Sequence, residues 1–279
     1  MLTSLSYLQL LLGIVILAIP AYVYYAFDRP SLQGLAVAVG RMVIQLSLVG
    51  LLLWAVYTVD SPWLTGLWLI LMSAVVALGT CRRARLSKRL MLPVAAGTFA
   101  SVLLMTLYLL LVVLRAVEPL SAKWVVPVAG VLLAHVLTTN ISGLSAFYRQ
   151  LKAGRVEYET LTGNGLSHLK ALKPFAGQAL RAMAIPAITS LSATGLLALP
   201  LLLSGQLLAG LSPVVAVKLT VLFIIACLTT SVLALLLILW LADRLTFDRR
   251  GNHVNMTPHD EKMTDREREY TGDAETEKS

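Results

Sequence analysis

The chain has 279 residues, of which 57% are hydrophobic and only 14% are charged. Soluble domains average about 45–50% apolar and about 25% charged residues, so this composition excludes an ordinary soluble domain and indicates a membrane protein. Residues 1–242 hold 16 Lys or Arg and 5 Asp or Glu, whereas residues 243–279 hold 7 and 10. Most basic residues flank apolar runs, whereas nucleic-acid binding predicts a basic face interleaved with aromatic platforms, so we expect no nucleic-acid partner.

Seven apolar stretches are long enough to cross a bilayer, whose hydrocarbon core takes about 20 residues of helix. They fall at residues 6–27, 36–58, 63–80, 91–114, 125–147, 186–206 and 214–242. The first has no basic leader and no clear small-residue cleavage site, so we interpret it as a retained span. The predicted fold class is therefore all-α: a polytopic integral membrane protein with about seven transmembrane helices.

Basic residues cluster on alternate loops between these stretches. The clusters are Arg82, Arg83, Arg85, Lys88 and Arg89; Arg149, Lys152, Arg155, Lys170, Lys173 and Arg181; and Arg244, Arg249 and Arg250. Because cytoplasmic loops are the basic ones, the pattern predicts an N-terminus outside and a cytoplasmic C-terminus. From Asp243 onward the chain is polar and has too few aliphatic residues to offset the entropy of ordering. We expect residues 1–245 to form the membrane domain and 246–279 a disordered cytoplasmic tail.

The only long loop inside the membrane domain, residues 148–185, reads as a cytoplasmic helix–turn–helix. Leucines are spaced among charged residues, and Gly163 and Gly165 break the helical pattern. Two interpretations stay open: an amphipathic connector that lies on lipid headgroups, and a docking element for a soluble partner.

Catalytic motifs are missing from the sequence. No glycine-rich phosphate loop is present, so any ATP must be hydrolysed by another chain. His135 is the only histidine within a predicted span, and no acidic residue lies in a span to orient it as in a catalytic triad. Cys81 and Cys227 suggest neither a disulfide framework nor a metal site. We expect a chain that is not an enzyme and carries no cofactor of its own.

Polar side chains inside spans are costly and are therefore functional candidates. Arg41 and Gln45 lie four residues apart, on one helical face. Arg41 either reaches lipid phosphates or lines a pathway. Gln45 has two donors and an acceptor to satisfy, so we expect it to bond to another helix or to face a cavity.

The fifth and sixth predicted spans carry the remaining candidates. His135 lies near mid-membrane, where a neutral imidazole coordinates a cation or relays a proton, unless it simply bonds a neighbouring carbonyl; it is a weak candidate metal ligand. The sixth span is rich in small and helix-breaking residues, which suit either a pathway helix or plain close packing. We predict that Gln45 and His135 share a cavity. The candidate pathway residues are Arg41, Gln45, His135, Asn140, Thr189, Ser192 and Gln206.

Several short runs, in this order and spacing, resemble the FetB-like family of ABC-transporter permeases over about residues 30–245. They lie at residues 39–50, 126–130, 181–186, 195–206 and 211–213, and include Val-Pro-Val-Ala-Gly and Arg-Ala-Met-Ala-Ile-Pro. Members of that family are inner-membrane permeases that work with a separate ATPase and are implicated in iron export, with plant relatives in aluminium tolerance. The resemblance implies a multi-pass permease of the inner (plasma) membrane that forms a homodimer among membrane lipids.

The resemblance also implies roles for the partner and the loop. ATP and Mg²⁺ would be bound by a cytoplasmic ABC ATPase subunit, which the loop at 148–185 would engage. The candidate coupling residues are Glu157, Glu159, Leu161, Gly163 and Gly165.

The sequence departs from the family pattern where substrate would bind. Val131, His135 and Leu137 replace methionines and an Asn of the fifth span, and Leu201, Leu202 and Leu203 replace Gly-Met-Met of the sixth. Thr189 and Ser192 replace an acidic and a basic residue, so soft thioether ligands and a fixed carboxylate are both missing. The expected cargo is a metal ion such as iron or another small, even lipid-like, solute; the alternative function is a membrane scaffold or sensor without transport.

Overall fold

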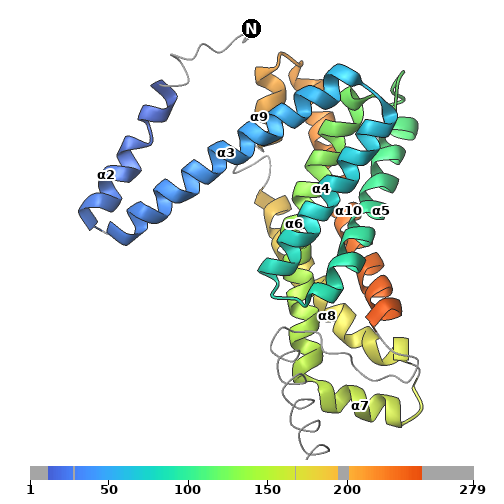
Figure 1. The fold of residues 1–279 in the computed structure, drawn as a ribbon. Coiled ribbons are helices and arrows are strands. Elements are labelled where there is room, and N and C mark those ends of the chain that lie inside the picture. The colour runs from blue at the N-terminus through green and yellow to red at the C-terminus, as the bar shows by residue number, and fades with distance from the viewer. Residues whose placement is uncertain (1–11, 28, 167, 194–200, 247–279) are drawn as a thin grey trace, which may run out of the picture.

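The computed structural model describes residues 12–27, 29–166, 168–193 and 201–246, and all regular secondary structure within these ranges is helical (Figure 1). The α-helices are α2 (Ala18–Phe27), α3 (Arg29–Val59), α4 (Pro62–Arg83), α5 (Met91–Tyr108), α6 (Ala122–Ala153), α7 (Arg155–Gly163), α8 (His168–Ala193), α9 (Leu201–Leu208) and α10 (Pro213–Thr246). A 3₁₀ turn, η1 (Lys88–Leu90), precedes α5, and a π-helical segment, η2 (Leu109–Val113), continues it.

Five of the described helices are long and apolar enough to cross a membrane: α3, α4, α5 with η2, α6 and α10. An all-α, multi-pass membrane protein is therefore confirmed, although a count of seven spans is not. The first predicted span appears as a shorter apolar helix, Leu12–Phe27, preceded by residues outside the described ranges.

The sixth predicted span, residues 186–206, is described only in part. Helix α8 begins at His168 and runs through Pro174 and Pro186 to Ala193, and α9 begins only at Leu201. Residues 194–200 lie outside the described ranges. Hydropathy separates the polar first half of α8 from its apolar second half, although both belong to one helix.

The core of the molecule lies between α4, α5, α6 and α10, which pack side by side (Figure 1). Its most enclosed side chains include Val102, Leu132, Leu144 and Leu235. Helix α5 approaches α10 closely at Gly97, where an added Cβ would lie 2.6 Å from Ile238 Cγ1 and 2.9 Å from its backbone nitrogen. Small residues permit such close approach where apolar burial alone gives little drive to associate.

At one end of the bundle the chain makes an elbow of α6, α7 and α8 (Figure 1). Helix α6 ends at Gly154, whose Cβ position lies 2.8 Å from the ring of Phe175 in α8. Helix α7 ends at Gly163, and Gly165 follows with φ of +83°, a conformation that favours glycine. Helix α7 and the first part of α8 thus lie on either side of the glycine turn, inside the predicted loop.

The end of α10 reaches the same region. The helix continues to Thr246, and Arg244 lies 4.5 Å from the ring centroid of Trp240. The predicted tail, apart from its first residue, lies outside the described ranges.

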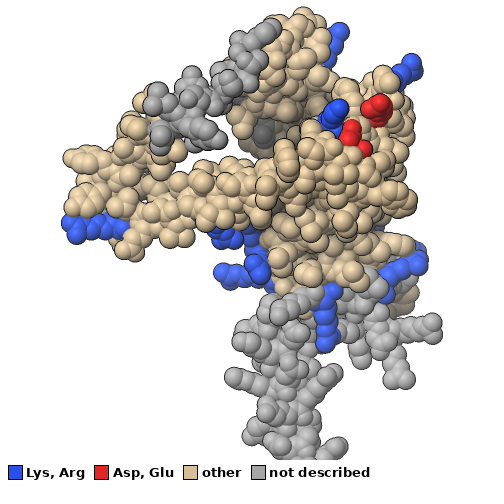
Figure 2. Space-filling model, turned by 45° about the horizontal axis from the view of Figure 1, so that its top comes forward, with Lys and Arg blue, Asp and Glu red and all other residues tan. Residues whose placement is uncertain are grey.

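Helices α2 and α3 form a hairpin that leaves the bundle at an oblique angle (Figure 1). Arg29 lies 5.2 Å from the ring centroid of Tyr25 where the two helices meet. Only the carboxyl-terminal part of α3 contacts the bundle: Val56 is buried, and Leu52 and Leu53 pack against the core. The rest of α3 diverges from α4 and α6, so a wedge opens between hairpin and bundle; Figure 2 shows the hairpin as a projecting arm.

Candidate functional site

The interior of the bundle contains polar side chains that have no hydrogen-bond partner among the described residues. Asn140 of α6 is only 1% exposed, and neither its amide nitrogen nor its amide oxygen bonds to a residue that the structure describes. The hydroxyls of Ser73 on α4 and of Thr98 and Thr106 on α5 are also buried and without a described partner. Buried polar groups are normally bonded, so each such group is a candidate for ligand contact or for a second conformation.

His135 lies one and a half turns before Asn140 on α6. Its main-chain carbonyl accepts hydrogen bonds from Thr138 at 2.8 Å and from Thr139 at 2.9 Å. Thr139 Oγ1 also lies 3.0 Å from Ser231 Oγ of α10. The Nε2 atom of His135 is buried, and no described residue bonds to it. The imidazole therefore lies on a helix that is hydrogen-bonded to α10, and its Nε2 atom has no hydrogen-bond partner among the described residues.

The remaining pathway candidates fall in separate environments. Thr220 of α10 donates a hydrogen bond of 3.3 Å to Gln206 Oε1, which ties α9 to α10. Thr189 is exposed and donates to the carbonyl of Ile185 one turn earlier. Ser192 belongs to α8, but its side chain lies outside the described part of the structure.

Arg41 and Gln45 are exposed on α3, in the part that has left the bundle. Neither side chain has a hydrogen-bond or ion-pair partner among the described residues, and no hydrogen bond joins Gln45 to His135. The cavity that we predicted these two residues to share stays a prediction.

Asp60 is a structural residue that the sequence did not single out. It follows α3 with φ of +41°, and its carboxylate accepts hydrogen bonds from the Ser121 hydroxyl at 2.9 Å and from the Ala122 amide at 2.8 Å. These bonds cap the amino terminus of α6, where the helix dipole also favours a negative charge. The backbone bond, the Ser121 bond and the nearby Lys123 lower the pKa of Asp60. Asp60 therefore fixes the base of the hairpin to the bundle.

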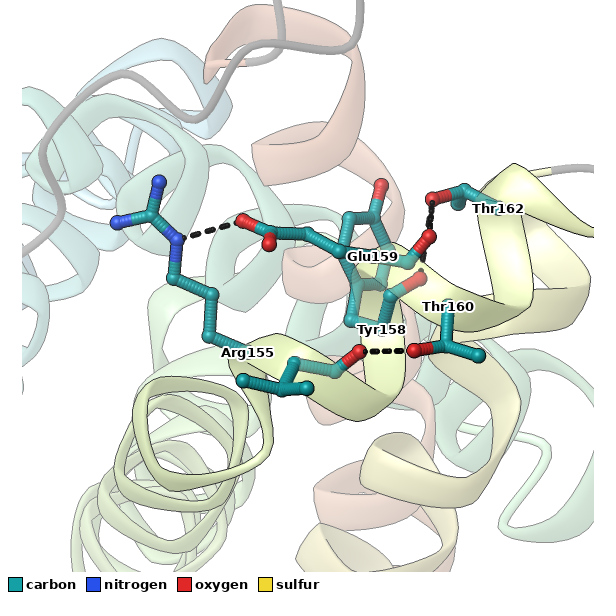
Figure 3. Close-up of polar contacts among 6 residues, drawn as sticks. Arg155, Tyr158, Glu159, Thr160 and Thr162 are labelled. Carbon is teal, nitrogen blue, oxygen red and sulfur yellow. Dashed lines mark hydrogen bonds and ion pairs between the residues drawn. The ribbon is translucent and has the colours of Figure 1, made fainter.

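Helix α7 presents one buried and one exposed face (Figure 3). Tyr158 is buried, and its burial, together with the charge of Asp243 on α10, raises its pKa. Leu161 packs against the core, so this coupling candidate faces inward. On the exposed side, Arg155 Nε donates to Glu159 Oε1 at 2.8 Å, and Val156 is 76% exposed. Val156 is thus an apolar contact candidate that the sequence missed.

The other coupling candidates, Glu157 and the two glycines of the turn, are exposed as well. Thr160 and Thr162 donate back to main-chain carbonyls of α7, and so hold its short coil (Figure 3). The exposed face of α7 can therefore meet a partner without unfolding.

Charge is distributed unevenly along the molecule. Exposed Arg82, Arg83, Arg149 and Lys152 lie at the elbow end of α4 and α6. Figure 2 shows blue basic side chains at both ends of the molecule, and the red acidic side chains in view lie at the end opposite the elbow, beside some of the basic ones. Among the described residues, no group of three or more His, Cys, Asp or Glu side chains is placed to hold a metal ion.

The five apolar helices, with short helices at their ends, define a multi-pass helical membrane protein. The chain belongs to UPF0014, an uncharacterised protein family, whose model matches residues 7–247. It is 28% identical over 202 residues to the UPF0014 membrane protein slr1647 of Synechocystis, covering 70% of this chain and 76% of the relative.

Two further bacterial relatives cover more of the chain. UPF0014 membrane protein YjkA of Bacillus subtilis is 24% identical over 82% of this chain and 90% of the relative. The probable iron export permease protein FetB of Escherichia coli is 24% identical over 78% of this chain and 83% of the relative. The FetB-like resemblance is thereby confirmed at the level of the family. No solved structure matches the chain.

Proposed function

We propose that this chain is the permease subunit of an ATP-driven (ABC) transporter in the inner (plasma) membrane. It exports a metal ion such as iron or another small solute, and two copies pair to form the pathway. A separate cytoplasmic subunit binds ATP and Mg²⁺ and hydrolyses the nucleotide. The N-terminus faces outward, and the elbow and the C-terminus face the cytoplasm.

The observation that carries the proposal is the elbow at the basic end of the bundle, in a chain whose relative is named an export permease. An excess of Arg and Lys marks the cytoplasmic side of a membrane protein. The face of α7 with Val156 and Glu159 is exposed there, beyond the ends of α4 and α6. A short amphipathic helix in this position is available to a soluble ATPase.

The elbow is also built to transmit movement. Tyr158 and Leu161 hold α7 against the body of the molecule, and Gly154 lies against Phe175 at the joint with α6 and α8. A displacement of α7 should therefore move α6, because closely packed helices transmit a shift from one to the next. Helix α6 carries His135 and Asn140, so a push at the elbow reaches the polar interior.

We assign substrate contact to the polar side chains of the spans. His135 Nε2 and the Asn140 amide are buried donors or acceptors without described partners, and they suit a cation or a polar solute. Arg41 and Gln45 of α3, Thr189 and Ser192 of α8, and Gln206 of α9 complete the proposed pathway.

The test is binding and stimulation of a candidate ABC ATPase subunit that is co-expressed with this chain. A Val156→Asp, Glu159→Lys double variant should lose most ATPase recovery in detergent. Its folding should persist, since Val156 is exposed and an exposed i,i+4 ion pair contributes only about 0.3–0.5 kcal/mol. Glu118→Lys, a charge reversal at the opposite end, is the matched control. Leu161→Asp would test folding instead, because Leu161 packs against the core.

Undiminished ATPase recovery with the double variant would contradict docking at α7. In a separate experiment, the permease and the ATPase are reconstituted together, and stimulation of ATP hydrolysis is measured against a panel of metal ions and organic solutes. A stable complex that no solute stimulates would favour the scaffold or sensor function.

A further inference from the structure

The surface of α3 that packs on the bundle continues beyond the bundle. Leu52 and Val56 pack against the bundle, and the same helical face continues through Val49 at spacings of three and four residues toward the amino terminus. We call this continuation the α3 stripe; it consists of Gly34, Ala38, Arg41 and Gln45. All four of its residues are exposed. A protein-facing surface thus runs on into a region where no described residue covers it.

The α3 stripe is a poor lipid surface. Gln45 carries two donors and one acceptor, and neither it nor Arg41 has a partner among the described residues. In hydrocarbon an amide without a partner is costly, so the stripe favours a protein neighbour that offers polar groups.

A complementary surface is left open on α6. Ala134, Thr138 and Ser142 recur every four residues and are exposed, a small-xxx-small pattern of the kind that lets membrane helices approach closely. His135 borders this face, which we call the α6 stripe. Its small residues would admit the α3 stripe, and the hydroxyls of Thr138 and Ser142 would supply polar partners.

Both stripes can be measured from one point, because Asp60 at the end of α3 is bonded to Ser121 and Ala122 at the start of α6. At 1.5 Å per residue, Gln45 is about 22 Å along α3 and Thr138 about 24 Å along α6. The two residues therefore lie at similar distances along their helices from this point, although α3 runs obliquely to α6 (Figure 1).

We infer that two copies of this chain exchange their α2–α3 hairpins, so that the α3 stripe of each copy packs against the α6 stripe of the other. The hairpin suits this exchange because it is attached only at the carboxyl end of α3 and projects from its own bundle (Figure 1). The wedge beside it then receives the second copy. Gln45 and His135 meet across the interface, which places the predicted shared cavity between two chains.

The exchange rests on the pairing of copies proposed above, and cysteine cross-linking in native membranes tests it. Cys81 and Cys227 are first replaced by Ala. One tagged copy then carries Gln45→Cys and a second, differently tagged copy carries Thr138→Cys. Oxidation should yield a covalent dimer that bears both tags. Ser47→Cys, two residues along α3 on its opposite face, is the matched control and should give none.

A second pair, Ala38→Cys with Ser142→Cys, serves if the first lowers expression, and should also cross-link between copies. A dimer by native mass spectrometry in which neither pair cross-links would overturn the exchange while leaving the pairing of copies intact. A further variant carries both cysteines in one chain, and cross-links formed only within that chain would place the hairpin on its own bundle and overturn the exchange. A chain that stays monomeric, yet binds its ATPase, would reject both the exchange and the pairing.

Discussion

Helix α3 and helix α5 with η2 have similar mean hydropathy, and both are long enough to cross a membrane, yet they are covered very differently. In the most apolar stretch of α3, 6% of residues are buried, against 39% for α5 with η2. Gly97 of α5 touches Ile238, whereas Gly40 of α3 has no atom within 4 Å of its Cβ position. Hydropathy therefore predicts that a segment enters the membrane, but not whether lipid, its own chain or a second copy surrounds it.

The largest expected effect is at the α5–α10 crossing. Gly97→Ala places a methyl group against the Ile238 backbone, which cannot move aside as a side-chain tip can. Overpacking of this kind costs about 1–3 kcal/mol, and more where backbone must shift. We expect a large loss of monodisperse protein and a lower unfolding temperature in detergent. Gly40→Ala on the bare helix should change neither by much, and equal effects of the two variants would contradict the packing difference.

The second-largest expected effect is a change in stability when Asn140, inside the bundle, is replaced. Asn140→Leu removes an amide that is buried without a partner, and relieving that burial should raise stability by about 1–3 kcal/mol. Thr139→Val is the neighbouring control and should lower stability by about 0.5–1.5 kcal/mol, since its hydroxyl bonds to both His135 and Ser231. Thermal unfolding in detergent measures both.

The same variant also separates structure from function at this position. If Asn140 contacts substrate, the more stable Asn140→Leu protein should bind the ATPase normally and lose its stimulated turnover. A fall in the unfolding temperature would show instead that the amide is bonded in the working protein.

A smaller effect is expected at the joint between hairpin and bundle. Asp60→Asn keeps the left-handed backbone and one acceptor but removes the charge at the amino terminus of α6, and should lower the unfolding temperature by a few degrees. Because folding lowers the pKa of Asp60, its stabilising effect is complete above the unfolded pKa of about 3.9 and is lost as pH falls through the folded pKa. The difference between wild type and variant should be constant near neutral pH and shrink below about pH 4. A difference independent of pH would point to geometry and not charge.

Much of the bundle could be predicted from the sequence because its helices carry unbroken apolar runs. The predicted spans at 36–58, 63–80, 125–147 and 214–242 each fall within a long apolar helix of the structure, and 91–114 exceeds such a helix by one residue. The span at 186–206 stays a prediction, because its first part belongs to α8 and residues 194–200 lie outside the described ranges. The abrupt change in hydropathy at its start does not coincide with the start of a helix, since α8 begins at His168.

The candidate site was less accessible to sequence reasoning. Spacing alone placed Arg41 and Gln45 on one face, but not the divergence of that face from the bundle. The bond from Ser121 to Asp60 joins residues 61 positions apart, so no local pattern could reveal it. Leu161 and Val156 looked equally apolar, and only packing shows which faces inward.

The smallest expected effect compares two glycines of the hairpin. Gly34 and Gly40 both have open space around their Cβ positions in one chain, so alanine at either should stabilise α3 by at most about 1 kcal/mol. Gly34 lies on the α3 stripe and Gly40 on another face, so only Gly34→Ala would add a methyl group to an exchanged interface. We expect Gly34→Ala to shift the dimer toward monomer on dilution in detergent, and Gly40→Ala to leave that equilibrium unchanged. Identical dissociation of the two variants would mean that the stripe faces lipid. The low buried fraction of α3 would then reflect contact with lipid and not a missing protein partner.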